Sequence, residues 1–163
     1  MRLTKDNKIL IIGLGIIGGS YAAKLSQAGY HVSAITRTQL SIDYALENDI
    51  ISQGTTDIDK SLIAEADLII FALPPIEFLE WVKDYSELIK PPSLITDVTG
   101  VKFPIVEEVQ TALSHGVEFI AAHPMAGREV GGVQSADPEL FKKANYILTP
   151  TEKNSQEAID TCI

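Results

Sequence analysis

A glycine-rich hexapeptide near the N-terminus, Gly13-Leu14-Gly15-Ile16-Ile17-Gly18, constrains the fold more than any other segment of the chain. It follows an apolar run at residues 9–12, which predicts a buried strand, and opens a stretch at 16–28 that predicts a helix ended by Gly29. With this spacing, the first glycine makes a tight turn and the second lets a phosphate approach the backbone. The third lets helix and strand pack closely, and the helix N-terminus offers free N–H groups to the phosphate. The motif predicts a dinucleotide-binding loop, whereas a glycine turn kept only for packing is the alternative.

Apolar runs alternate with amphipathic stretches along the whole chain. This order is typical of an α/β fold with a doubly wound, mostly parallel sheet and helices on both faces, which is a Rossmann-type domain. The other expected strands lie at 31–35, 50–52, 67–73, 93–96, 117–122 and 146–148. The other expected helices lie at 40–48, 61–65, 76–88, 101–114 and 138–143, and one more begins at 155.

The length of 163 residues fits one ordinary domain with a real core. We expect residues 1–150 to form the dinucleotide-binding domain. Residues 151–163 begin a helix that no glycine, proline or cap closes, and we expect it to lead into a C-terminal helical domain.

Composition narrows the class of partner and the compartment. The chain has 22 acidic and 13 basic residues, a net charge of −9, which disfavours nucleic acid as a partner. No apolar run approaches the ~20 residues that span a bilayer, so we expect no membrane association. A single cysteine, Cys162, excludes an internal disulfide and favours the cytoplasm. No spacing of residues suggests a metal site.

The end of the second expected strand bears on the identity of the dinucleotide. NAD-binding sites usually place an acidic residue there, whereas this chain has Thr36-Arg37-Thr38. Arg37 can pair with a 2′-phosphate, and the two hydroxyls can add hydrogen bonds, so the sequence favours NADP over NAD. A solvated surface role for Arg37 is the alternative. Leu73 and Pro74, at the exit of a later strand, are expected to contact the cofactor.

Two further strand ends carry chemistry. Asp97-Val98-Thr99-Gly100-Val101-Lys102 joins a strand to a helix, and Lys102 is expected in the first helical turn, where a cation opposes the helix dipole. His123 follows the strand at 117–122, and its imidazole can exchange a proton near neutral pH. In an open α/β sheet these carboxyl ends form the ligand-binding edge. An exposed lysine and a strand-end histidine without a catalytic role are the alternatives.

The glycine loop extended to Gly19-Ser20, the segment 97–102, and His123-Pro124-Met125-Ala126-Gly127 occur in this order. Together they resemble the prephenate and arogenate dehydrogenases of tyrosine biosynthesis, over essentially the whole chain, as the N-terminal nucleotide-binding domain of that family. The resemblance implies NAD(P)-dependent oxidative decarboxylation of prephenate or arogenate. His123 would accept the proton of the ring C4 hydroxyl, hydride would pass to the nicotinamide, and CO₂ would leave the ring.

The resemblance also implies roles for individual residues. His123, Thr99 and Lys102 would be catalytic, and Asp97 would lie at the cofactor. Gly100, Gly127, Arg128 and Glu129 would lie on the substrate side. Gly100 stands where many relatives have serine, and Arg128 where the family often has a small hydroxyl residue. A surface ion pair between Arg128 and Glu129 is the alternative.

The family carries a C-terminal domain that builds a homodimer and supplies an arginine to a substrate carboxylate. Without it, the 163-residue chain is expected to bind cofactor but to turn over poorly. Another β-hydroxyacid-type dehydrogenase and a non-catalytic NAD(P)-binding module are the alternative readings. The sequence leaves the choice between prephenate and arogenate open.

Overall fold

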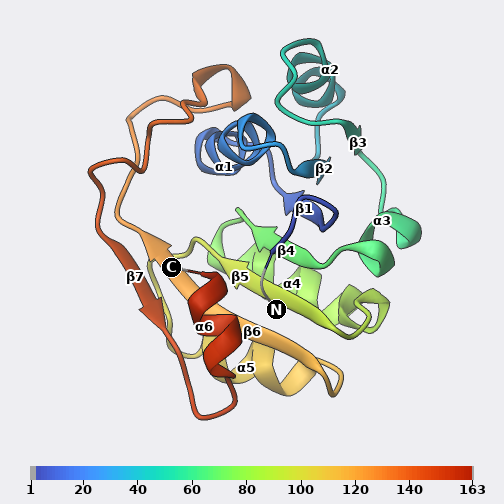
Figure 1. Ribbon diagram of the computed structural model, residues 1–163, viewed down its shortest axis with the longest axis vertical. Coiled ribbons are helices and arrows are strands. Elements are labelled where there is room, and N and C mark those ends of the chain that lie inside the picture. Colours follow the sequence, from blue (N-terminus) through green and yellow to red (C-terminus); the bar gives the residue numbers. More distant parts are fainter. Residues whose placement is uncertain (1–2, 163) are drawn as a thin grey trace.

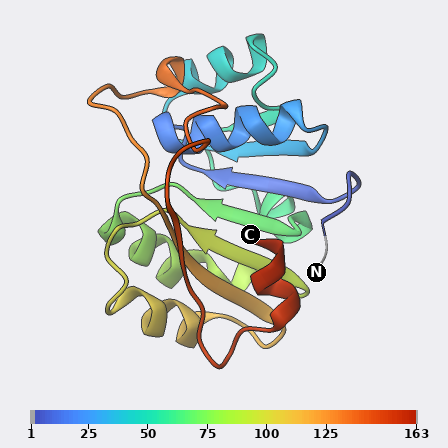
Figure 2. The same cartoon turned by 60° about the vertical axis from the view of Figure 1, so that its left-hand side comes forward.

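The computed structural model describes residues 3–162. Their strands form one seven-stranded sheet (Figure 1). Its strand order is β3-β2-β1-β4-β5-β6-β7, and every neighbouring pair is parallel except β6 and β7. The carboxyl ends of the parallel strands meet at one edge (Figure 2). The chain changes direction across the sheet between β1 and β4, and this switch point is where such folds bind ligands. The strands are β1 (Lys8–Ile12), β2 (His31–Ile35), β3 (Gln53–Thr55), β4 (Leu68–Phe71), β5 (Ser93–Asp97), β6 (Val117–Pro124) and β7 (Tyr146–Thr149).

Helices cover both faces of the sheet, which confirms the predicted fold class. Along β1, Ile9 and Ile11 belong to one buried cluster and Leu10 and Ile12 to the other, so this central strand is apolar on both sides. The first cluster packs under α1 (Ile16–Gln27), α2 (Gln39–Glu47) and α6 (Gln156–Thr161), together with the short 3₁₀ helix η2 (Val133–Ser135). The second packs under α3 (Lys60–Glu65), α4 (Pro75–Tyr85) and α5 (Ile105–Ala112); a second 3₁₀ turn, η1 (Ser86–Leu88), follows α4.

The helix expected at 101–114 begins later, at Ile105. Pro104 precedes it, and a proline disfavours the helical conformation for the residue before it. The chain from Val101 to Phe103 therefore stays irregular, and Lys102 lies in the β5–α5 loop rather than in a helical turn. This correction removes the argument that Lys102 opposes a helix dipole.

Two further expectations are wrong in position or type. The third strand forms at 53–55 rather than 50–52, because Ile50 and Ile51 are buried in the core beside α2 and the paired segment comes after them. Residues 138–143 form successive turns instead of a helix. The ring of Phe141 in these turns packs on Tyr21 of α1, with ring centroids 4.5 Å apart.

Candidate functional site

The three glycines of the hexapeptide occupy three different environments. Gly13 has φ of +100°, and a Cβ there would lie 2.5 Å from the Ala72 carbonyl oxygen. A Cβ at Gly18 would lie 1.9 Å from the carbonyl oxygen of Gly13. At Gly15, by contrast, a Cβ would meet no atom within 4 Å. The fold itself requires the first and third glycines, whereas Gly15 leaves backbone open to an approaching group.

The N-terminus of α1 faces this open backbone. Gly15 is the N-cap residue, no side chain caps the helix, and its first turn contains no acidic residue. Free N–H groups at such a terminus favour an anion. They open into a cleft of about 560 Å³. The cleft is lined by Ile12, Gly13, Leu14, Gly15, Ile35, Thr36, Arg37, Thr38, Ser41, Thr56, Ile58, Ala72, Leu73, Pro74, Glu77, Glu80, Trp81, Asp84 and Tyr85.

The predicted ribose-side residues lie together on one rim of this cleft. The Thr36 hydroxyl accepts a hydrogen bond from the Leu14 N–H at 3.3 Å, so it braces the glycine loop. The hydroxyls of Thr38 and Ser41 lie 2.7 Å apart. Arg37 is exposed and pairs with no acid within residues 3–162. This rim therefore offers a free guanidinium to a ligand in the cleft.

Helix α4 forms the opposite wall. Leu73 and Pro74, which were predicted to contact the cofactor, lead into it and line the cleft. Trp81 and Tyr85, four residues apart on this helix, pack against each other with ring centroids 5.4 Å apart. Glu77 and Trp81 also line the cleft, although the sequence did not point to them as cleft residues. Their i, i+4 spacing on an amphipathic helix was the available signal.

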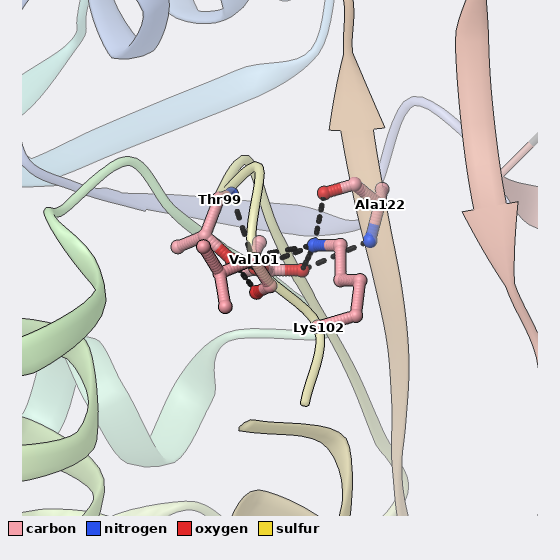
Figure 3. A network of polar contacts seen from close by, with 5 residues as sticks. Thr99, Val101, Lys102 and Ala122 are labelled. Atoms are coloured by element: carbon pink, nitrogen blue, oxygen red, sulfur yellow. Dashed lines mark hydrogen bonds and ion pairs between the residues drawn. The ribbon is translucent and has the colours of Figure 1, made fainter. Parts of the chain in front are cut away.

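A buried polar network holds the neighbouring strand ends β5 and β6 together (Figure 3). The Asp97 side chain is fully buried. Its carboxylate accepts hydrogen bonds from the Thr99 hydroxyl, from the Thr99 N–H at 3.1 Å and from the Ala122 N–H at 2.9 Å. Lys102 Nζ lies 2.9 and 2.8 Å from the two oxygens. The Asp97 carboxylate thus exposes no surface through which to contact a cofactor.

Lys102 is enclosed by acceptors. Besides Asp97, its ammonium donates to the Ala122 carbonyl at 2.6 Å and lies 3.3 Å from the Thr99 hydroxyl. Burial lowers the pKa of Lys102 below its ordinary value, and the Asp97 carboxylate opposes that shift. The structure brings Asp97, Thr99 and Lys102 together, but their polar atoms bind one another and the backbone beside His123.

His123 lies within β6 rather than after it, and its backbone is opposite Ile147 of β7. The imidazole is half-buried, and Gly100 faces it. A Cβ at Gly100 would lie 3.4 Å from Cε1 and 3.5 Å from Nε2 of His123. The missing side chain at Gly100 leaves one face of the ring uncovered. His123 shares the carboxyl edge of the sheet with the cleft but is not among its lining residues.

The segment after His123 folds back over α1. The Asp137 N–H donates to the Ser20 hydroxyl at 2.9 Å, and a Cβ at Gly19 would lie 3.1 Å from Val133 Cγ2. The small residues Gly19 and Ser20 therefore leave room for this segment, a role that was not predicted from the sequence.

The exposed residues Gly127, Arg128 and Glu129 lie in the same segment. Arg128 pairs with Asp137, not with Glu129, so the expected neighbouring ion pair is corrected. The backbone N–H of Glu139 and the Arg128 guanidinium lower the pKa of Asp137.

Other chemistries find little support in the described chain. Within residues 3–162, no group of three or more His, Cys, Asp and Glu side chains is placed to hold a metal ion. No helix in this part is long and apolar enough to cross a bilayer. Burial raises the pKa of the Cys162 thiol to about 11, which keeps it protonated and weakly nucleophilic at neutral pH.

The chain resembles known proteins in both sequence and fold. Residues 21–163 match the family described as "Prephenate dehydrogenase, nucleotide-binding domain". Prephenate dehydrogenase of Lactococcus lactis subsp. cremoris is 36% identical over 157 residues, covering 93% of this chain and 43% of that relative. The chain therefore spans less than half of that relative's length.

Two solved structures share the architecture. Synechocystis arogenate dehydrogenase superposes with a TM-score of 0.86 at 32% identity, over 94% of this chain and 53% of the other. Prephenate dehydrogenase from A. aeolicus, in complex with hydroxyphenyl propionate and NAD⁺, gives 0.87 at 28% identity, over 98% and 56%. The family match covers most of the chain, and the chain belongs to the prephenate dehydrogenase family as its nucleotide-binding domain.

Proposed function

We propose that this chain is the NAD(P)-binding domain of a prephenate or arogenate dehydrogenase and supplies its catalytic histidine. The observation that carries the proposal is the placement of His123 on the same carboxyl edge as the cleft beneath the uncapped α1 N-terminus. The open backbone at Gly15 fits a pyrophosphate, because the position where a Cβ would stand is free.

His123 acts as the general base for the hydroxyl on the substrate ring. A nicotinamide held in the cleft would supply the hydride acceptor for the carbon that carries this hydroxyl. The imidazole takes the hydroxyl proton, and the open face at Gly100 admits the substrate to the ring. Gly127, Arg128 and Glu129 remain predictions as substrate-side residues.

Lys102 and Thr99 act on the reaction through His123 rather than on the substrate. The Lys102 ammonium binds the carbonyl of Ala122, the residue before His123, and Asp97 binds the N–H of the same residue. This closed network fixes the backbone from which the imidazole projects. We therefore propose Asp97, Thr99 and Lys102 as positioning residues.

The cofactor is proposed to be NADP in preference to NAD. Arg37 stands free on the rim of the cleft, beside the hydroxyls of Thr38 and Ser41, and a guanidinium pairs well with a 2′-phosphate. Titration of both cofactors against wild type and Arg37→Ala tests this. We expect Arg37→Ala to weaken NADP binding selectively, whereas equal losses, or tighter NAD binding by the wild type, would refute the preference.

The complete enzyme is proposed to be a cytoplasmic homodimer in which the segment 151–163 leads into a C-terminal helical domain. The relatives that this chain resembles are about twice its length. Helix α6 (Gln156–Thr161) lies within the segment 151–163, and Ile163 lies outside the described residues. We propose that this C-terminal domain completes the substrate pocket.

Assay of the product of the whole reading frame tests the function. Prephenate and arogenate are each tried with NAD and NADP, for wild type, His123→Asn and the control His31→Asn, which alters an exposed histidine on β2. We expect His123→Asn to lower kcat by about 100-fold to 10,000-fold, and His31→Asn to leave it unchanged. Near-normal turnover by His123→Asn would overturn the base assignment. Cofactor binding without turnover of either substrate would instead favour a non-catalytic module.

A further inference from the structure

Two buried polar atoms without partners lie on adjacent turns of α4. One is Oε2 of Glu77 and the other is the indole Nε1 of Trp81, and neither has a hydrogen-bond partner among residues 3–162. Both residues line the cleft, and Trp81 is 8% exposed. A buried polar group without a partner is costly, so each such group in a native protein needs an explanation, and a bound molecule that supplies the partner is one.

The two atoms have opposite hydrogen-bonding roles. The Glu77 carboxylate can only accept a hydrogen bond, and the indole N–H of Trp81 can only donate one. Their residues are four apart on one helix and so face the same side. A ligand that satisfies both must present a donor beside an acceptor. Adenine does so with its exocyclic amine next to a ring nitrogen, whereas hypoxanthine replaces the amine by a carbonyl acceptor.

The charge distribution along the cleft orients the ligand. The uncapped start of α1 and the free Arg37 make one part electropositive and suited to phosphate. Glu77, Glu80 and Asp84 make the α4 wall acidic, which disfavours phosphate there and suits a base that presents N–H groups. Ile58 and Tyr85 add apolar surface for a flat ring.

We propose that Glu77 and Trp81 read the adenine base of the dinucleotide, with Glu77 accepting from the exocyclic amine and Trp81 donating to the neighbouring ring nitrogen. This assignment rests on the proposed dinucleotide function and adds base specificity to it. It goes beyond a crevice that holds the base by apolar contact alone, because it makes the cleft discriminate between purines.

Binding titrations with NADPH and its hypoxanthine analogue test the assignment without measuring turnover. Trp81 is the only tryptophan of the chain, so its emission reports binding at the proposed contact. We expect wild type to bind NADPH at least tenfold more tightly than the analogue. Glu77→Gln should reduce this ratio to threefold or less, because an amide can donate to the carbonyl of hypoxanthine. The comparison variant Glu80→Gln removes one charge from the same wall at an exposed position, so it should change both affinities alike and keep the ratio.

The outcomes separate the two levels of the proposal. If neither dinucleotide saturates the wild type, the dinucleotide function itself fails. If both bind wild type equally well, only the adenine contacts fail, as they would if Glu77 and Trp81 satisfied each other. Trp81→Phe, followed by isothermal calorimetry after its fold is checked by circular dichroism, should weaken NADPH binding and leave analogue binding less affected. An equal effect on both ligands would contradict the donor role of Trp81.

Discussion

The cleft at β1, β2 and β4 and the network at β5 and β6 lie on the same edge of the sheet but handle polar groups in opposite ways. The cleft leaves polar groups free: an uncapped helix terminus, the Arg37 guanidinium, and the buried atoms of Glu77 and Trp81. In the network, Asp97 and Lys102 find their partners inside the protein. The cleft therefore has polar groups that a ligand can pair with, whereas the network pairs its polar groups within the protein and needs no ligand.

This contrast bears on the different roles proposed for Asp97, Lys102 and His123, which are all titratable residues at strand ends. A lysine and an aspartate at a strand end resemble catalytic groups in sequence. Here their capacity for hydrogen bonds is used up on Thr99 and Ala122, beside the histidine. His123 differs from them because Gly100 leaves one face of its ring open.

Breaking the closed network should have the largest effect on stability. Lys102→Met leaves the Asp97 carboxylate buried without its cation, which costs about 3–5 kcal/mol of unfolding free energy. Urea denaturation measures this loss. The control Lys8→Met removes the ion pair with Glu65, in which both side chains are 58% exposed. Its loss should lower the unfolding free energy by less than about 1 kcal/mol. Similar small losses for both variants would contradict the closed character of the network.

The glycine loop should separate stability from binding. Gly18→Ala forces a Cβ against the Gly13 carbonyl, and we expect a loss of about 1–3 kcal/mol or more in thermal or urea unfolding. Gly15→Ala has room in the protein, so its unfolding free energy should change by less than about 1 kcal/mol. It should instead weaken dinucleotide binding about tenfold, or about 1.4 kcal/mol. Undiminished binding by Gly15→Ala would show that the open backbone is not the phosphate site.

The smallest expected effect is on the local stability of the segment after His123, which exposed ion pairs connect to α1. Hydrogen bonds from Lys24 and Lys142 lower the pKa of Glu139 from 4.5 to about 2. The unfolded carboxylate binds its proton at higher pH, so this stabilisation is present above pH 4.5 and is lost as the pH falls toward 2.

Amide protection factors measure that loss. On acidification from about pH 5 to about pH 2.5, the Asp137 N–H should lose protection before the amide of Ile95 in the central strand β5. Lys24→Met should lessen the pH dependence at Asp137. Simultaneous loss at both amides would indicate global unfolding and contradict a local release.

Features set by neighbouring residues were predictable from the sequence. The strand–glycine–helix unit at 9–28 follows from local spacing, and Trp81 and Tyr85 pack as their helical spacing predicts. Pro104 delays the start of α5 and leaves Lys102 in the loop, and this local effect could also have been predicted from the sequence. The roles of the site residues stay predictions.

Features that depend on distant segments were not accessible. Ser20 meets the N–H of Asp137, 117 residues away, and no periodicity reports such a contact. The choice of Asp137 over Glu129 as the partner of Arg128 depends on how turns fold the segment back. Likewise, the free atoms of Glu77 and Trp81 emerge only when the cleft is formed.

The strand order has a consequence for contacts between molecules. Among the strands of residues 3–162, the two at the edges of the sheet are short: β3 has three residues and β7 has four, against eight in β6. An edge strand offers its free N–H and C=O groups to strands of other chains, and the number of such groups grows with its length. By ending on both sides in so few residues, the sheet presents a poor template for aggregation, even though Ile147 on β7 is exposed.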